Sequence, residues 1–208
     1  MITFKDLGMH GRLGNQMFQY AALRGIAEKN NFVCKIPDFS SFNWHGQDCL
    51  LNNFNLKADK LQPIDQFNIL GRNINERNHD QFDQSFFNLP ENVSIKGFFQ
   101  FTKYFEHCED TIREEFKPKK QFIDIAESKL SKFKADGYET VSIHVRRGDM
   151  MQHMFQDTGI HPDTVFGLEN IFDKSTIFGN YLNKSMDFFT NKKVKYLVFA
   201  GGKRSGDD

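Results

Sequence analysis

The feature that most constrains the fold of this chain is a pair of strand-like runs with a helical pattern between them. Residues 139–145 (ETVSIHV) and 194–200 (VKYLVFA) are rich in β-branched and aromatic residues, and residues 181–189 have helical character. Two such runs joined through a helix predict a β–loop–α–β unit of a parallel sheet. The chain is therefore expected to be an α/β protein.

A second transition from strand to helix opens the chain. A short strand is expected at residues 2–4, and a glycine-rich turn leads from it into a helix that continues to about Glu28 with apolar residues at helical spacing. Asn15 is the expected N-cap of this helix. The unpaired N–H groups of its first turn suit an anion, although a tight structural turn explains the same glycines equally well. The spacing matches neither the phosphate loop nor the dinucleotide fingerprint.

An arginine pair follows the first of the two later strands. The hexapeptide HVRRGD occupies residues 144–149, so Arg146 and Arg147 stand where a parallel strand would end. Ligands of open α/β sheets bind at the carboxyl ends of strands, and a guanidinium fork fits phosphate oxygens. The pair therefore favours a phosphorylated ligand, with a solvated charged turn as the alternative.

Together, the two segments resemble the α-1,2-fucosyltransferase family. GRLGNQMFQYA at residues 11–21 is similar to the family's N-terminal signature, and HVRRGD is similar to its H-x-R-R-x-D motif. The chain between these two segments also resembles the family's central segment, in three stretches that occur in the same order: residues 97–100, 103–105 and 112–116. The resemblance extends over most of the 208 residues.

The resemblance implies a GT-B-like fold of two facing Rossmann-like lobes. Residues 1–136 would form the lobe on the acceptor side, and residues 137–208 would form part of the C-terminal lobe that holds the nucleotide sugar. In the family, further strands and helices follow a strand like residues 196–200. Because a parallel sheet is normally covered on both faces, we expect the chain to be C-terminally truncated and its second lobe to be incomplete.

The implied reaction transfers L-fucose from GDP-fucose to the 2-hydroxyl of a terminal galactoside, with inversion and without a divalent metal. Arg146 is expected to be catalytic, because a guanidinium beside the diphosphate stabilises the charge that grows on the leaving group. Arg147 is expected to orient its loop through a carboxylate or to contact the nucleotide. On the facing lobe, the residues expected to bind the donor are Arg12, Gly14, Asn15 and Gln16.

The other polar residues around the arginine pair have open roles. His144 is either a packed histidine at the end of its strand or a substrate-side residue that supports the arginines. Asp149 is either the general base that removes the acceptor proton or the partner in a salt bridge that closes the loop. His153 and His161 have no partner that the sequence identifies, so the general base stays unassigned. No D-x-D motif of the metal-dependent sugar transferases is present, and no metal site is expected.

The composition of the chain disfavours some classes of binding partner and indicates a cellular compartment. The chain has 27 basic and 27 acidic side chains, so there is no net charge to attract nucleic acid. No apolar stretch approaches the ~20 residues of a membrane span, and no signal-peptide pattern opens the chain. The cysteines lack metal-ligand spacing and are expected to be buried free thiols: Cys34, Cys49 and Cys108. A cytoplasmic enzyme is expected, with peripheral contact at the inner face of the membrane left open.

Residues 37–92 have no sustained period and are rich in Asn, Asp and Gln. This pattern predicts loops that are held by single aromatic anchors and that carry the acceptor specificity. Trp44 in this stretch is a candidate sugar-stacking platform, although a core aromatic is the more common case. The remaining expected elements are strands near residues 32–36 and 93–99, a helix over 105–116, and a helix around 123–130 that Gly137 ends.

Two functions of other classes are alternatives. Residues 147–149 spell R-G-D, a cell-adhesion tripeptide, but adhesion requires an exposed extracellular loop, which the preceding strand and the free thiols disfavour. The second alternative is an inactive truncated fragment that acts at most as a module binding GDP or a glycan.

Overall fold

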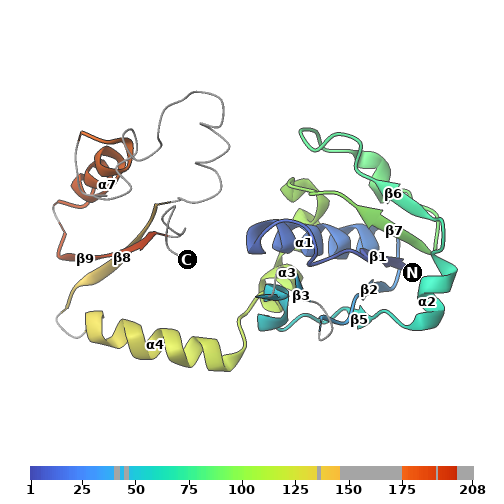
Figure 1. Cartoon of the computed structure of the whole chain (residues 1–208), viewed down its shortest axis with the longest axis horizontal. Helices are drawn as coiled ribbons and strands as arrows, with labels where there is room; N and C mark the ends of the chain where they lie inside the picture. The colour runs from blue at the N-terminus through green and yellow to red at the C-terminus, as the bar shows by residue number, and fades with distance from the viewer. Residues whose placement is uncertain (40–42, 45–46, 135–136, 146–174, 191, 201–208) are drawn as a thin grey trace. The chain divides into compact units, whose positions relative to one another are not determined.

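The computed structural model describes the chain except for residues 40–42, 45–46, 135–136, 146–174, 191 and 201–208 (Figure 1). The chain divides into two compact units, Met1–Ile123 and Asp124–Asp208, and each is described by itself. The lobes predicted over residues 1–136 and 137–208 are functional assignments, and they stay predictions.

A five-stranded parallel sheet forms the centre of the first unit. Its order is β5 (Asp59–Lys60), β2 (Cys34–Ile36), β1 (Ile2–Thr3), β7 (Val93–Lys96) and β6 (Asn73–Asn75). Each neighbouring pair of strands is parallel. The central strand β1 is fully buried, because Ile2 and Thr3 are both 0% exposed. This Rossmann-like sheet confirms the predicted α/β class.

Helix α1 (Leu13–Lys29) follows β1 and lies against the sheet (Figure 1). The predicted apolar face is confirmed, since Ala22 and Ile26 belong to the main core and Met17 packs half-buried against it. Ala21 belongs to a second, smaller cluster with Cys108 and Ile112. The helix is therefore buried on more than one side.

A buried carboxylate connects α1 to helix α3 (Glu109–Glu115). Glu115 is 0% exposed and accepts hydrogen bonds from the Tyr20 hydroxyl, from the Arg24 guanidinium at 2.9 Å and from the Lys57 backbone N–H at 3.3 Å. Burial, reinforced by the Glu115 carboxylate, raises the pKa of Tyr20 above its usual value. The Tyr20 hydroxyl thus stays protonated and donates to Glu115.

The helix predicted over residues 105–116 is confirmed only in its second half. The segment consists of two 3-10 turns, η4 (Thr102–Tyr104) and η5 (Glu106–Cys108), followed by α3. Phe105 separates the two turns, because its φ of −140° departs from helical geometry. The predicted apolar face is nevertheless present, with Cys108 and Ile112 buried.

Residues 37–92 contain several short elements. These are β3 (Asn43–Trp44) paired antiparallel with β4 (Gln47–Asp48), η2 (Leu50–Asn53), β5, α2 (Pro63–Asn68), β6 and η3 (Gln84–Phe87). The predicted aromatic anchors are confirmed at Phe39 and Phe86, which are 4% and 1% exposed. Strands β5 and β6 were not predicted, because two or three residues are too few to show a period of two.

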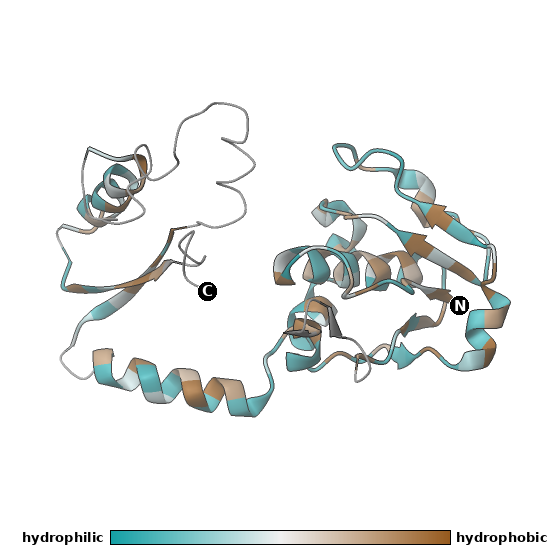
Figure 2. Cartoon of the chain, viewed as in Figure 1, coloured by the Kyte–Doolittle hydropathy of each residue, from teal (hydrophilic) through white to brown (hydrophobic). Residues whose placement is uncertain are grey.

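The second unit contains the predicted β–loop–α–β pattern. Strands β8 (Glu139–Val145) and β9 (Val194–Ala200) pair in parallel along their whole length, and α7 (Ile177–Asp187) lies between them in sequence. Helix α4 (Lys120–Lys134) precedes β8 and ends before Gly137, as predicted. Figure 2 shows apolar and polar residues alternating along α4, none of which is buried.

The described cysteines are buried and free, as predicted. Burial raises the pKa of the Cys34 thiol to about 12 and that of Cys108 to about 11. Both thiols are therefore protonated and unreactive near neutral pH. Within the described part of the chain, no helix has both the length and the apolarity that a membrane crossing needs.

Candidate functional site

The strand order of the first unit has its switch point between β1 and β7. From β1 the chain passes through α1 to β2 on one side, and β7 pairs with β1 on the other. In open α/β sheets, ligands bind outside the carboxyl ends of the strands at such a point. The segments that follow β1 and β7 therefore form the candidate site.

The segment after β1 is a loop whose shape requires glycine. Gly8 and Gly11 have φ values of 89° and 76°, which residues with a side chain rarely adopt. A Cβ on Gly11 would lie 2.5 Å from the side-chain nitrogen of Asn15, and a Cβ on Gly8 would lie 2.7 Å from the Cys49 sulfur. The tight structural turn considered from the sequence is therefore present.

Gln16 holds this loop from inside. The residue is 6% exposed, and its Nε2 donates to the Gly8 carbonyl at 3.2 Å and to the Gly11 carbonyl at 3.3 Å. The Cys49 thiol donates to Gln16 Oε1 at 3.9 Å. These contacts give Gln16 a role in shaping the loop, and its predicted contact with the donor stays a prediction.

Helix α1 begins earlier than the sequence indicated. Its N-cap is Arg12, and the prediction of Asn15 as N-cap was wrong, because the Gln16 backbone N–H already bonds to the Arg12 carbonyl at 3.0 Å. No side chain caps the helix, and its first turn contains no acidic residue. Arg12 and Gly14 are exposed. An uncapped helix start beside an exposed arginine is electropositive and suits an anion.

Asn15 connects the two sides of the switch point. Its Oδ1 accepts a hydrogen bond from Gln100 Nε2 at 2.7 Å. One turn further along α1, Gln19 donates to the Gly97 carbonyl at 3.1 Å. These hydrogen bonds hold the segment after β7 against the start of α1. The Asn15 side chain contacts Gln100, and its predicted contact with the donor, like that of Gln16, stays a prediction.

A charged pair that the sequence analysis did not single out spans the same edge. Asp6, which follows β1, lies 3.4 Å from the Nζ of Lys96, the last residue of β7. Asp6 and Lys96 are thus site residues that the motifs missed, while Gln100 ends the segment 97–100 that resembles the family's central segment but had no predicted role. Asp6 follows the strand expected at residues 2–4, which was a signal for it, whereas Lys96 lies inside the strand expected at 93–99 and only the structure shows that β7 ends there.

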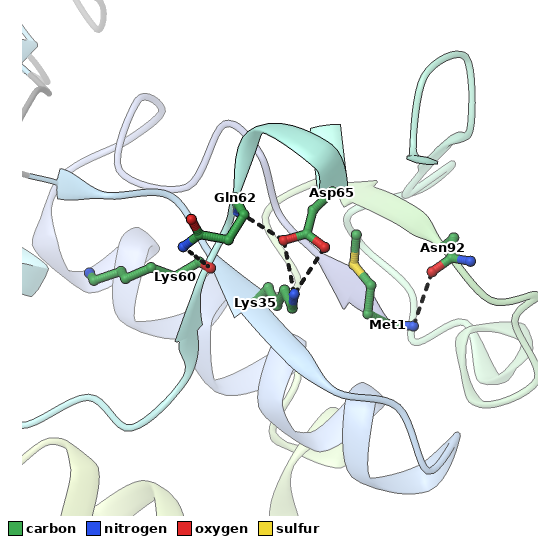
Figure 3. A network of polar contacts seen from close by, with 6 residues as sticks. All are labelled: Met1, Lys35, Lys60, Gln62, Asp65 and Asn92. Carbon is green, nitrogen blue, oxygen red and sulfur yellow. Dashed lines mark hydrogen bonds and ion pairs between the residues drawn. The ribbon is translucent and has the colours of Figure 1, made fainter. Parts of the chain in front are cut away.

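Helix α2 is fixed beside this edge of the sheet by an ion pair. The Lys35 Nζ donates to both oxygens of Asp65 at 2.9 Å, and the Gln62 backbone N–H donates to Asp65 at 2.8 Å (Figure 3). The Asp65 carboxylate has a lowered pKa, mainly because of the hydrogen bond from Lys35. It is therefore ionised near neutral pH, which keeps α2 attached to β2.

In the second unit, the described strand leads up to the arginine motif. His144 is exposed on β8, opposite Phe199 of β9, and Val145 is 1% exposed at the end of the strand. The other predicted residues of this region lie outside the described residues, and their roles stay predictions: Arg146, Arg147, Asp149, His153 and His161.

The part of the chain that the structure describes contains no group of three His, Cys, Asp or Glu side chains that could hold a metal ion. The polar groups at the switch point are instead amides, an exposed arginine, backbone N–H groups and one ion pair. Such a set can bind an anion and hydroxyl groups.

Comparison with known proteins identifies relatives over nearly the whole chain. The sequence model of glycosyl transferase family 11 matches residues 2–202. A curated relative, galactoside alpha-(1,2)-fucosyltransferase 1 of Bos taurus, is 28% identical over 201 residues, which cover 92% of this chain and 49% of the relative. The chain thus spans about half the length of that relative. No solved structure matches the chain significantly.

Proposed function

The chain belongs to glycosyl transferase family 11, and from this premise we propose that it transfers L-fucose from GDP-fucose to the 2-hydroxyl of a terminal galactoside. The name of the bovine relative, at 28% identity, supports the sugar, the acceptor class and the linkage. In this proposal, residues 1–136 form the acceptor-side lobe and residues 137–208 contribute to a facing Rossmann-like lobe that holds the nucleotide sugar.

In the proposed reaction, O2 of the galactoside forms a bond to C1 of fucose while the bond from C1 to the diphosphate oxygen breaks. The configuration at C1 inverts, and GDP leaves. The proton of the acceptor hydroxyl passes to a general base, for which Asp149 is the candidate. Negative charge grows on the diphosphate in the transition state, and Arg146 stabilises it electrostatically while Arg147 orients the loop.

The observation that carries the proposal is the position of the glycine-rich signature. It lies at the switch point of the sheet, where the loop after β1, the uncapped start of α1 and the exposed Arg12 come together. A helix start of this kind binds anions, and the diphosphate of a nucleotide sugar is such an anion. Arg12 therefore neutralises the donor from the N-terminal lobe.

Steady-state kinetics of Arg146→Ala test the proposal. GDP-fucose and lactose are the substrates, a chelator is present, and mass spectrometry detects fucosyl-lactose. Arg146→Ala is expected to lower kcat by about 10²–10³-fold, because it removes a charge that acts on the leaving group. Arg113→Ala is the matched control, because Arg113 is exposed on α3 and paired with Glu109. A near-normal rate in Arg146→Ala would contradict the catalytic assignment.

Calorimetric titration of GDP into the same variants separates binding from turnover. The proposal predicts that GDP binds the chain with chelator present and that Arg146→Ala weakens this binding. GDP binding without any transfer by the chain would favour the alternative function, a module that only binds GDP or a glycan.

A further inference from the structure

A cavity of about 490 Å³ opens at the carboxyl edge of the five-stranded sheet. Its lining includes residues that follow three neighbouring strands: Lys5 and Asp6 after β1, Asp38 after β2 and Leu61 after β5. Because these strands are parallel, their carboxyl ends lie at one edge and their following residues converge there. The volume is in the range of about 300–1,000 Å³ that is common for sites of small ligands.

Two carboxylates give the cavity its chemical character. Asp6 is paired with Lys96 at 3.4 Å, which restricts its orientation, and Asp38 lies exposed on the segment after β2. Ionised carboxylates accept hydrogen bonds from hydroxyl groups, while the Gln66 amide on α2 can donate and accept. Lys5 also lines the cavity and Lys96 is paired with Asp6, so the two carboxylates are balanced and the cavity has no excess positive charge that would attract a diphosphate. The lining therefore suits a neutral ligand that carries several hydroxyl groups.

Part of the cavity lining is aliphatic. The aliphatic residues of the lining are Leu61, Ile69 and Leu70. Ile69 is 4% exposed, whereas Leu70 is 77% exposed. A sugar ring presents hydroxyl groups at its edge and C–H groups on its face. The carboxylates can bind the hydroxyl groups and the aliphatic residues can pack against the C–H groups, as in other sites that combine apolar lining with a few polar groups.

We propose that this cavity binds a hexose unit of the saccharide acceptor, with Asp6 and Asp38 accepting hydrogen bonds from its hydroxyl groups. The assignment rests on the proposed function and adds to it the residues that hold the acceptor. One loop connects the two ligands: the segment after β1 supplies Asp6 to the cavity and Arg12 to the start of α1. Acceptor and diphosphate thus lie at opposite ends of the same glycine-rich segment.

Titration of lactose into the chain without GDP-fucose, followed by saturation-transfer NMR of the sugar, tests the cavity directly. Asp38→Asn replaces one carboxylate acceptor with an amide and is expected to raise the Kd for lactose about tenfold or more. Gln66→Trp fills the cavity from an exposed position on α2 and is expected to abolish binding. Asp80→Asn is the matched control, because it makes the same charge change on an exposed residue that does not line the cavity. Thermal melting verifies that each variant is folded.

Lys96→Met separates the two roles of Asp6. It removes the ion pair but keeps the carboxylate, so lactose binding should survive in Lys96→Met and weaken in Asp6→Asn. An unchanged lactose Kd in Asp38→Asn and Gln66→Trp, or no lactose binding by the folded chain, would overturn the proposal. Competitive displacement of lactose by GDP would also overturn the proposal, because the nucleotide would then occupy the cavity.

The kinetic assay distinguishes failure of the cavity from failure of the proposed function. If fucose is transferred and the KM for lactose is the same in Asp38→Asn as in the unsubstituted chain, the cavity assignment fails and the function stands. If lactose binds in the cavity and no fucose is transferred, the function fails and the cavity assignment stands.

Discussion

Replacing Glu115 with leucine is expected to destabilise the first unit strongly. The substitution keeps a side chain of similar size but removes the acceptor that Tyr20, Arg24 and the Lys57 backbone N–H share. Removing one partner of a buried ion pair costs about 3–5 kcal/mol, because the other charge is left without compensation. The Arg24 side chain is 25% exposed and can be partly rehydrated, so we expect a loss of about 3 kcal/mol.

Two further variants test whether the lost charge pair causes this effect. Glu115→Gln keeps an acceptor oxygen and is expected to cost about 1–2 kcal/mol. Adding Arg24→Met to Glu115→Leu removes the uncompensated cation, and the double variant should recover part of the stability lost in Glu115→Leu. Arg113→Met breaks an exposed ion pair with Glu109 and should change stability by no more than about 0.5 kcal/mol.

Urea unfolding, followed by circular dichroism and by hydrogen exchange of the α1 amides, measures these differences. Exchange is needed because the chain has two compact units that can unfold separately. A loss below about 1 kcal/mol in Glu115→Leu, with no recovery in the double variant, would refute the reasoning that this carboxylate holds α1 to α3.

Two other outcomes follow from buried positions in the same unit. Gly25→Ala should lower the melting temperature, at a cost of about 1–3 kcal/mol, because its Cβ would lie 2.1 Å from the Tyr104 carbonyl oxygen. Gly14 lies on the same helix with open space around it, so Gly14→Ala should raise the stability by up to about 1 kcal/mol. Burial raises the pKa of Cys34 from its usual value of 9.0 to about 12. The contribution of the protonated Cys34 thiol to the free energy of unfolding is therefore fully present below pH 9, and it is lost as the pH rises toward 12. Its slope approaches about 1.4 kcal/mol per pH unit, and Cys34→Ala should flatten it in urea unfolding between pH 8 and 11.

The parts of the fold that were predictable are those with long, regular patterns. Strands β8 and β9 each have seven residues, and their predicted bounds agree with the structure. By contrast, β5 and β6 at the two edges of the sheet were missed, because their residues are mostly exposed and too few to show alternation. The N-cap of α1 was wrong for a different reason. The backbone N–H of Gln16 bonds to the Arg12 carbonyl, so Asn15 already lies in the first turn of the helix and cannot act as its N-cap.

The candidate site was predictable in its motifs but not in its extent. The glycine-rich signature is contiguous, so the sequence alone identified Arg12 and Asn15 as a group. Asp6 and Asp38 are separated by a whole helix and become neighbours of one cavity only because β1 and β2 are adjacent and parallel. Gln66 lies on α2 and lines the same cavity because the Lys35–Asp65 ion pair fixes α2 to β2. Strand order and helix docking therefore decide which polar residues line the same cavity, and neither is encoded in a short motif.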